Sequence, residues 1–136
     1  GSPDPYVKFK GSIVQLSSGE VLKQYALFKD SMRITRRRLE AFRRETVYGY
    51  GAALMLPVLD YHLQNALAFL KCVIDDDEKK EGLHYINLPV SIKTPKNIAH
   101  IEESVILITA VDNMRLLLPK VIAMRPKKII LPHNKI

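Results

Sequence analysis

The sequence predicts an α/β fold built around a mostly parallel β-sheet. From residue 21 onward, short apolar or β-branched runs alternate with segments of helical periodicity. Two of these runs, 69–74 and 105–110, are apolar almost throughout, which is typical of parallel strands covered on both faces. Such strands connect through right-handed crossovers. We therefore expect three layers, with helices on both sides of one sheet.

The first predicted helix is long and amphipathic and covers residues 21–44. Ser18 lies where an N-cap is expected. Residues 1–20 contain one short candidate strand over 10–16, and we interpret them as a tag remnant followed by a linker or the end of a preceding domain. Residues 21–136 form the α/β domain. The apolar stripe of the helix, at steps of three and four, consists of Val21, Tyr25, Phe28, Met32, Thr35, Leu39 and Phe42.

Strands and helices alternate after this helix. A strand over 46–50 leads into a helix over 54–65, with Pro57 in its first turn, where the missing N–H costs little. Asp112 is expected to cap the last helix, and Pro119 to kink or divide it. The other predicted elements are a strand over 69–74, an extended piece over 86–92, a short helix over 94–100, a strand over 105–110, a helix over 113–124 and a strand over 128–132.

Composition limits the class of protein and its partners. The 136 residues suffice for one domain, and 47% hydrophobic with 26% charged residues is typical of a globular protein. No apolar run is long enough to span a bilayer, so no membrane partner is expected. The formal net charge of +7 favours a nucleotide, a nucleotide sugar, a nucleic acid or an acidic protein surface. The single cysteine, Cys72, is expected to be buried in a strand and indicates a reducing, cytoplasmic compartment.

The run from Thr46 to Ala53 carries the main functional signal. It is a short strand that ends at two closely spaced glycines, Gly49 and Gly51, before an apolar helical segment. Such a turn can offer backbone N–H groups and the positive end of a helix to a phosphate. The complete dinucleotide-binding fingerprint requires glycine at position 54, where this chain has leucine. A tight strand–helix turn that binds nothing explains the spacing equally well.

Polar side chains follow three of the predicted strands, at 49–53, 75–77 and 109–113. Ligands of open α/β sheets bind beyond the carboxyl ends of the strands. Asp75 follows Gly51 at close to the spacing of about twenty residues expected for a carboxylate that accepts hydrogen bonds from ribose hydroxyls. A solvated turn is the alternative for the acidic segment. No metal site is expected, because three contiguous aspartates cannot converge on one ion and the histidines are scattered.

Taken together, the chain resembles the C-terminal domain of S-adenosylmethionine-dependent sugar C-methyltransferases. Residues 28–44 resemble the linking helix of that family, and 47–53 its glycine-rich turn. Residues 73–82 are similar to its Asp-x-x-x-x-Lys-x-Gly stretch, 88–90 to its His-Ile-Pro segment, and 10–13 to its Gly-Gly-Ser. The departures are the segment Leu54-Met55-Leu56-Pro57, where the family continues with a basic residue and glycine, and Asp112-Asn113, where it has Trp-Asn.

The resemblance implies a Rossmann-like domain that holds a nucleotide-linked sugar and catalyses nothing alone. The family's methyl donor and catalytic residues belong to a central methyltransferase domain, so we expect that domain as a partner and no cofactor, metal or catalytic residue in this chain. Arg33, Arg36 and Arg37 are candidates for pairing with phosphate. The expected ligand-binding residues are Gly49, Tyr50, Gly51, Ala52, Ala53, Asp75 and Asn113.

Two other functions stay open at this stage. The fold can serve as a structural or interaction domain that has lost its ligand, with Leu54 to Leu56 filling the former cleft and the arginine-rich helix contacting a partner. Nucleic-acid binding through the same helix is less favoured, because no aromatic residues are interleaved among the arginines to stack on bases. A solvated helix face is the plainest explanation of the arginine run.

Overall fold

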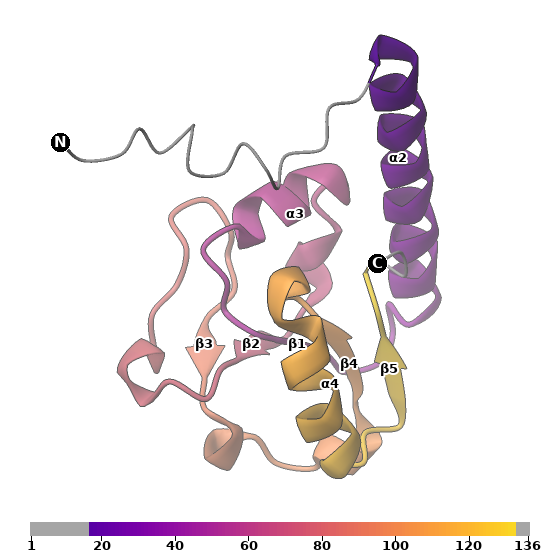
Figure 1. The fold of residues 1–136 in the computed structure, drawn as a ribbon. Helices are drawn as coiled ribbons and strands as arrows, with labels where there is room; N and C mark the ends of the chain where they lie inside the picture. The colour runs from indigo at the N-terminus through magenta and orange to yellow at the C-terminus, as the bar shows by residue number, and fades with distance from the viewer. Residues whose placement is uncertain (1–16, 133–136) are drawn as a thin grey trace, which may run out of the picture.

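A computed structural model describes residues 17–132 and shows an α/β domain with a five-stranded, all-parallel sheet (Figure 1). The spatial order of the strands is β3-β2-β1-β4-β5. Strand order therefore reverses between β1 and β4, which lie side by side in the middle of the sheet. The predicted fold class is confirmed. The strands are β1 (Val47–Tyr50), β2 (Cys72–Ile74), β3 (Ile92–Lys93), β4 (Val105–Ile108) and β5 (Lys128–Ile130).

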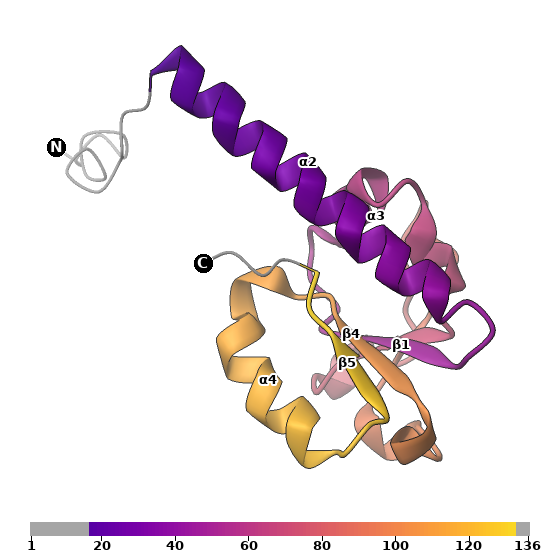
Figure 2. The ribbon, with the colours of Figure 1, turned by 90° about the vertical axis from the view of Figure 1, so that its right-hand side faces the viewer.

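The sheet separates two apolar cores, because alternate residues of each strand point to opposite faces. Helix α4 (Met114–Ala123) covers one face, and helices α2 (Ser18–Ala41) and α3 (Leu56–His62) lie on the other (Figure 2). Figure 2 shows α2 and α4 on opposite sides of the strands. On the α4 side the buried core consists of Tyr48, Tyr50, Cys72, Ile74, Ile106, Ile108 and Val121. The larger core on the α2 side includes Met32, Leu39, Val47, Leu56, Leu63, Leu67, Val73, Val105 and Leu107.

Helix α2 starts and ends three residues earlier than predicted. Ser17, rather than Ser18, is the N-cap, and its side-chain oxygen accepts a hydrogen bond from the Glu20 backbone N–H at 3.2 Å. This Ser-x-x-Glu pair fixes the start of the helix ahead of the apolar stripe. At the other end, the N–H of Phe42 donates to the Leu39 carbonyl at 3.0 Å, which closes the last turn. The predicted strand over 10–16 lies outside the described residues.

Only the C-terminal half of the predicted stripe on α2 is covered. Met32, Thr35 and Leu39 are buried. Val21 and Tyr25, on the same stripe, are 51% and 52% exposed, because the N-terminal half of the helix extends beyond the sheet (Figure 2). No helix within residues 17–132 combines the length and the apolar character needed to cross a membrane.

Helix α3 is shorter than the predicted 54–65. Gln64 and Asn65 adopt left-handed φ angles of 54° and 65°, which ends the helix. The 3₁₀-helix η2 (Ala66–Phe69) follows, and it includes Phe69, which was predicted to begin a strand. Pro57 lies in the first turn, as predicted.

The connection from β3 to β4 contains no α-helix. The predicted helix over 94–100 is replaced by two 3₁₀ turns, η4 (Pro95–Asn97) and η5 (Ile101–Glu103), because His100 has a left-handed φ of 59° between them. Of the extended piece predicted over 86–92, only Ile92 belongs to a strand, β3.

The predicted cap of the last helix was wrong, and of the two effects predicted for Pro119, a kink or a division, the division is not seen. Asp112 does not cap it, because it lies inside the 3₁₀ turn η6 (Val111–Asn113), which precedes α4. Pro119 does not divide α4, which continues from Met114 to Ala123, since a proline there removes a single hydrogen bond.

The uneven burial of α2 gives a paired prediction. Leu39→Ala, at a side chain that is 1% exposed, should lower the free energy of unfolding by about 2–5 kcal/mol through the cavity that it leaves. Leu22→Ala, on the same helix but 68% exposed, should change it by no more than about 0.5 kcal/mol. Urea unfolding followed by circular dichroism measures both, and equal losses would contradict the described packing of α2.

Candidate ligand-binding site

The turn after β1 is shaped by close packing against the segment that follows β4. Gly51 has a φ of +105°, and a Cβ atom at this position would lie 2.4 Å from the Cβ of Ala110. A Cβ atom at Gly49 would lie 2.9 Å from Cγ2 of Thr109. Close packing therefore excludes a larger residue at both positions, and the positive φ angle also favours glycine at position 51. The turn lies at the strand-order reversal, where open α/β sheets bind ligands.

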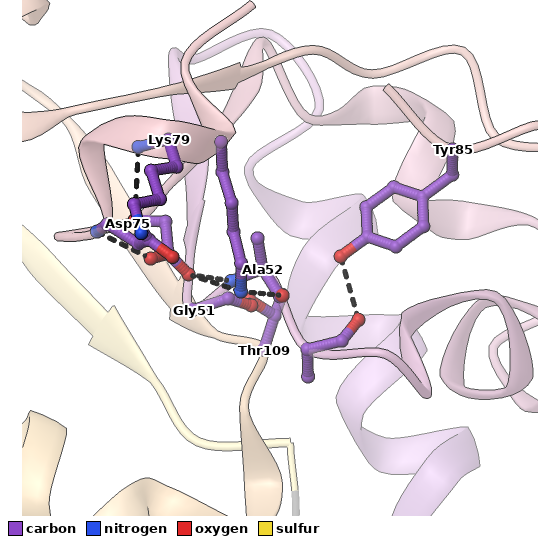
Figure 3. Close-up of polar contacts among 9 residues, drawn as sticks. Gly51, Ala52, Asp75, Lys79, Tyr85 and Thr109 are labelled. Carbon is purple, nitrogen blue, oxygen red and sulfur yellow. Dashed lines mark hydrogen bonds and ion pairs between the residues drawn. The ribbon is translucent and has the colours of Figure 1, made fainter. Parts of the chain in front are cut away.

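Asp75, which directly follows β2, is held against this turn. One of its carboxylate oxygens accepts the Ala52 N–H at 2.8 Å, and the other accepts the Asp77 N–H at 2.8 Å (Figure 3). The side chain is 16% exposed. The ammonium group of Lys80 lies 3.7 Å from the same carboxylate and donates to the Ala52 carbonyl at 3.1 Å. A carboxylate and an ammonium group thus bracket one peptide unit of the turn.

Two more carbonyl groups of the turn accept hydrogen bonds from side chains that lie far along the chain. The Thr109 hydroxyl donates to the Gly51 carbonyl at 2.7 Å, and the Tyr85 hydroxyl donates to the Ala53 carbonyl at 2.7 Å (Figure 3). Burial, and secondly the nearby charge of Asp75, raises the pKa of Tyr85 to about 12, so its hydroxyl stays protonated and remains a donor. The turn is therefore fixed before any ligand binds.

A second carboxylate, Asp76, lies on the other side of the same edge. The Tyr50 hydroxyl donates to it at 2.6 Å, and the ammonium group of Lys120, on α4, lies 3.1 Å from its other oxygen. The hydrogen bond from Tyr50 is the main cause that lowers the pKa of Asp76, and Lys120 lowers it further. Burial, followed by the bond to Asp76, raises the pKa of Tyr50 well above its usual value.

The structure brings most of the predicted site residues together. Gly49 and Tyr50 end β1, and Gly51, Ala52 and Ala53 form the turn against which Asp75 is held. Two N–H groups of the turn already have partners, since Gly51 donates to the Ile74 carbonyl at 2.7 Å and Ala52 donates to Asp75.

Asn113 is placed differently from the rest of the predicted set. It ends η6 and is the N-cap residue of α4, and its side chain makes no capping hydrogen bond there. Its backbone N–H donates to the Ala110 carbonyl at 3.0 Å, which places its backbone close to the segment packed on Gly51.

The three arginines predicted to pair with phosphate line a different surface. Arg33, Arg36 and Arg37 face a groove of about 960 Å³ between α2 and residues 61–65, which we call the arginine groove. Arg33 pairs with Asp30, and Arg36 lies 3.3 Å from Glu40. The sequence showed no aromatic residues interleaved among these arginines, but four aromatic side chains line the same groove: Tyr25, Phe28, Tyr61 and His62.

Sequence reasoning missed Lys120 and Tyr85 as residues of this edge, whereas Thr109 begins the polar strand end predicted over 109–113. Lys80 could have been identified from the sequence, because it matches the lysine of the Asp-x-x-x-x-Lys-x-Gly stretch. Lys120 and Tyr85 could not, since only the packing of α4 and of the loop before β3 brings them to the edge.

The described part of the chain holds no group of three or more histidine, cysteine, aspartate or glutamate side chains that could bind a metal ion.

No protein-family model, curated protein or solved structure matches this chain. The resemblance to sugar C-methyltransferases therefore depends on the residues quoted above and on how the fold arranges them.

Two glycines with left-handed φ angles give a matched pair of substitutions. Gly51→Ala should lower the free energy of unfolding by about 3 kcal/mol, because the new methyl group combines an unfavourable φ with a clash against Ala110. Gly82→Ala, at a φ of +80° with no atom within 4 Å of the new methyl, should cost only about 1 kcal/mol. Thermal and urea unfolding measure both, and equal costs would show that the turn does not pack on Ala110 as described.

The lowered pKa of Asp76 predicts a pH-dependent contribution of Tyr50 to stability. A carboxyl group with a folded-state pKa below its unfolded value of 3.8 stabilises the fold above that value, and the contribution disappears as the pH falls below it. Tyr50→Phe should therefore cost more stability at about pH 6 than at about pH 3. Tyr85→Phe is the control, because Tyr85 donates to a carbonyl and its loss should not vary over this range. Parallel pH profiles for the wild type and Tyr50→Phe would refute the linkage.

Proposed function

We propose that this domain binds a nucleoside diphosphate sugar at the carboxyl edge of its sheet, as the C-terminal portion of a sugar C-methyltransferase. One observation carries the proposal: Asp75 and Lys80, the two ends of the Asp-x-x-x-x-Lys stretch, both contact Ala52 of the glycine-rich turn. Two stretches that carry the family resemblance, far apart in sequence, thus meet at the strand-order reversal. That is where the fold class binds nucleotides.

Asp75 is suited to bind the ribose. Each of its oxygens accepts one backbone N–H and keeps a lone pair for a hydroxyl of the sugar ring. Because the backbone bonds orient the carboxylate in advance, little side-chain entropy is lost when a ligand binds.

Lys80 is the nearest cation for the diphosphate. Its ammonium group has three donors, and the Ala52 carbonyl takes one of them. Lys120 already neutralises Asp76, which reduces repulsion between that carboxylate and an approaching anion. No catalytic residue is proposed here, since methyl transfer would depend on S-adenosylmethionine in a preceding domain.

A second candidate is an interaction domain without a small ligand. It is favoured by the arginine groove and by the exposed apolar residues Val21, Leu22 and Tyr25 at the free end of α2. Such a surface fits an acidic partner domain with an apolar centre. Of the residues 54–56 that this hypothesis places in a former cleft, Leu54 and Met55 are 90% and 58% exposed, whereas Leu56 is buried in the core on the α2 side.

Titration of the ¹⁵N-labelled domain with dTDP-glucose tests the first candidate. We expect saturable chemical-shift changes at residues 51–53, 75–80 and 109–110, and weaker binding by about tenfold for Lys80→Gln, which removes one cation. Lys79→Gln is the matched control, since no ion pair of Lys79 is found within residues 17–132 and only its backbone N–H donates to Asp77.

Glucose alone should shift nothing at this edge. Absence of shifts at millimolar dTDP-glucose, together with an unchanged melting temperature, would reject the binding role and leave the interaction domain as the conclusion.

A further inference from the structure

The geometry points to a second binding site at the opposite end of the strands, for a small organic anion with an apolar body. The site is a cavity of about 480 Å³, within the size range of small-molecule pockets. It lies on the α4 face of the sheet, towards the amino ends of the strands, and we call it the amino-end cavity. The side chains on which the proposal rests are Tyr48, Lys71, Cys72, Lys93 and Ile98.

The missing crossover helix explains why this cavity exists. In a parallel sheet the connection between strands normally carries a helix that covers one face. Here the connection from β3 to β4 contains only the 3₁₀ turns η4 and η5. Residues 97–100 between them line one wall of the cavity, and the strand residues Tyr48 and Cys72 line the other. The short connection leaves space where a helix would pack.

Tyr48 supplies a hydrogen-bond donor that has no acceptor among the described residues. Its side chain is buried, at 6% exposure, yet its hydroxyl forms no hydrogen bond with any residue from 17 to 132. The hydroxyl oxygen itself is not fully enclosed, so it can be reached from the cavity that Tyr48 lines. Burial is also the main cause that raises the pKa of Tyr48, so the hydroxyl stays protonated. A ligand oxygen in the cavity would accept this hydrogen bond.

Two lysines give the cavity its preference for an anion. Neither Lys71 nor Lys93 has an ion-pair partner in the described part of the chain. Lys93 pairs in register with Ile74, so its side chain shares the face of Cys72 and Tyr48. Glu103 is the one acidic residue of the lining, which leaves a positive balance. The apolar wall formed by Ile98 and Cys72 accommodates the uncharged body of the ligand.

This site is separate from the proposed nucleotide-sugar site. Thr46, Lys71 and Ser91 immediately precede β1, β2 and β3, whereas Asp75 and the glycine turn follow their strands. The two sites lie at opposite ends of the strands, so a ligand of the cavity does not compete directly with a nucleotide. Neither proposal depends on the other.

The experiment uses three probes that share one phenyl ring: benzoate, phenyl phosphate and the neutral benzyl alcohol. Titrated into the ¹⁵N-labelled chain, an anionic probe should shift residues 46–48, 71–72 and 93–100 in a saturable way, and benzyl alcohol should not. Whichever of benzoate and phenyl phosphate binds more tightly identifies a carboxylate or a phosphate as the preferred group. Shifts at residues 51–53 report separately on the nucleotide-sugar site.

Single substitutions test which side chains of the cavity contact the anionic probe. Lys93→Gln and Tyr48→Phe should each weaken binding of the anionic probe, by about tenfold and about threefold, without unfolding the domain. Lys128→Gln, which removes an exposed charge on the other edge strand, should leave binding unchanged. Equal binding of benzyl alcohol, equal losses in Lys128→Gln and Lys93→Gln, or no saturable shift around the cavity would each overturn the proposal.

Discussion

The Asp75 carboxylate is the constraint on which the geometry of the sheet's carboxyl edge depends. It joins the end of β2 to the turn after β1 by accepting the Ala52 N–H. In many nucleotide-binding folds such an N–H is left for a phosphate. Here a fixed negative charge already occupies that position, so a phosphate cannot sit on Ala52 without repulsion. In the proposed complex a neutral ribose hydroxyl would approach Asp75, and the phosphates would lie nearer Lys80, whose ammonium group donates to the Ala52 carbonyl.

Many of the elements could be predicted from the sequence because their signals are local. The runs that became β1, β2 and β4 are apolar, and the two glycines mark the turn that packs on Ala110. Asp75 was identified by its spacing from that turn. The helix boundaries were predicted less well, because Ser17 and the left-handed Asn65 decide them and an apolar stripe carries no information about either.

The side chains that make up the two proposed sites could be predicted only in part, because tertiary packing decides which of them meet. Lys120 meets Asp76, and Tyr85 meets Ala53, only after strand order and helix packing are fixed. The arginines of α2 were assigned to phosphate on charge alone, but the groove that they line is determined by where α3 ends. No pattern in the sequence indicates the cavity beside Tyr48, because it arises where the connection between β3 and β4 contains no α-helix.

Helix α2 connects the two candidate functions. Its 24 residues correspond to about 36 Å of helix, and the sheet covers only the half that contains Met32 and Leu39. In most proteins a helix is stabilised chiefly by burying its apolar face, and here Val21, Leu22 and Tyr25 remain half or more exposed among the described residues. A partner surface on that half of α2 would not obstruct the carboxyl edge, since no residue of the glycine turn lines the arginine groove. Holding a nucleotide sugar and docking on a catalytic domain are therefore compatible in one molecule.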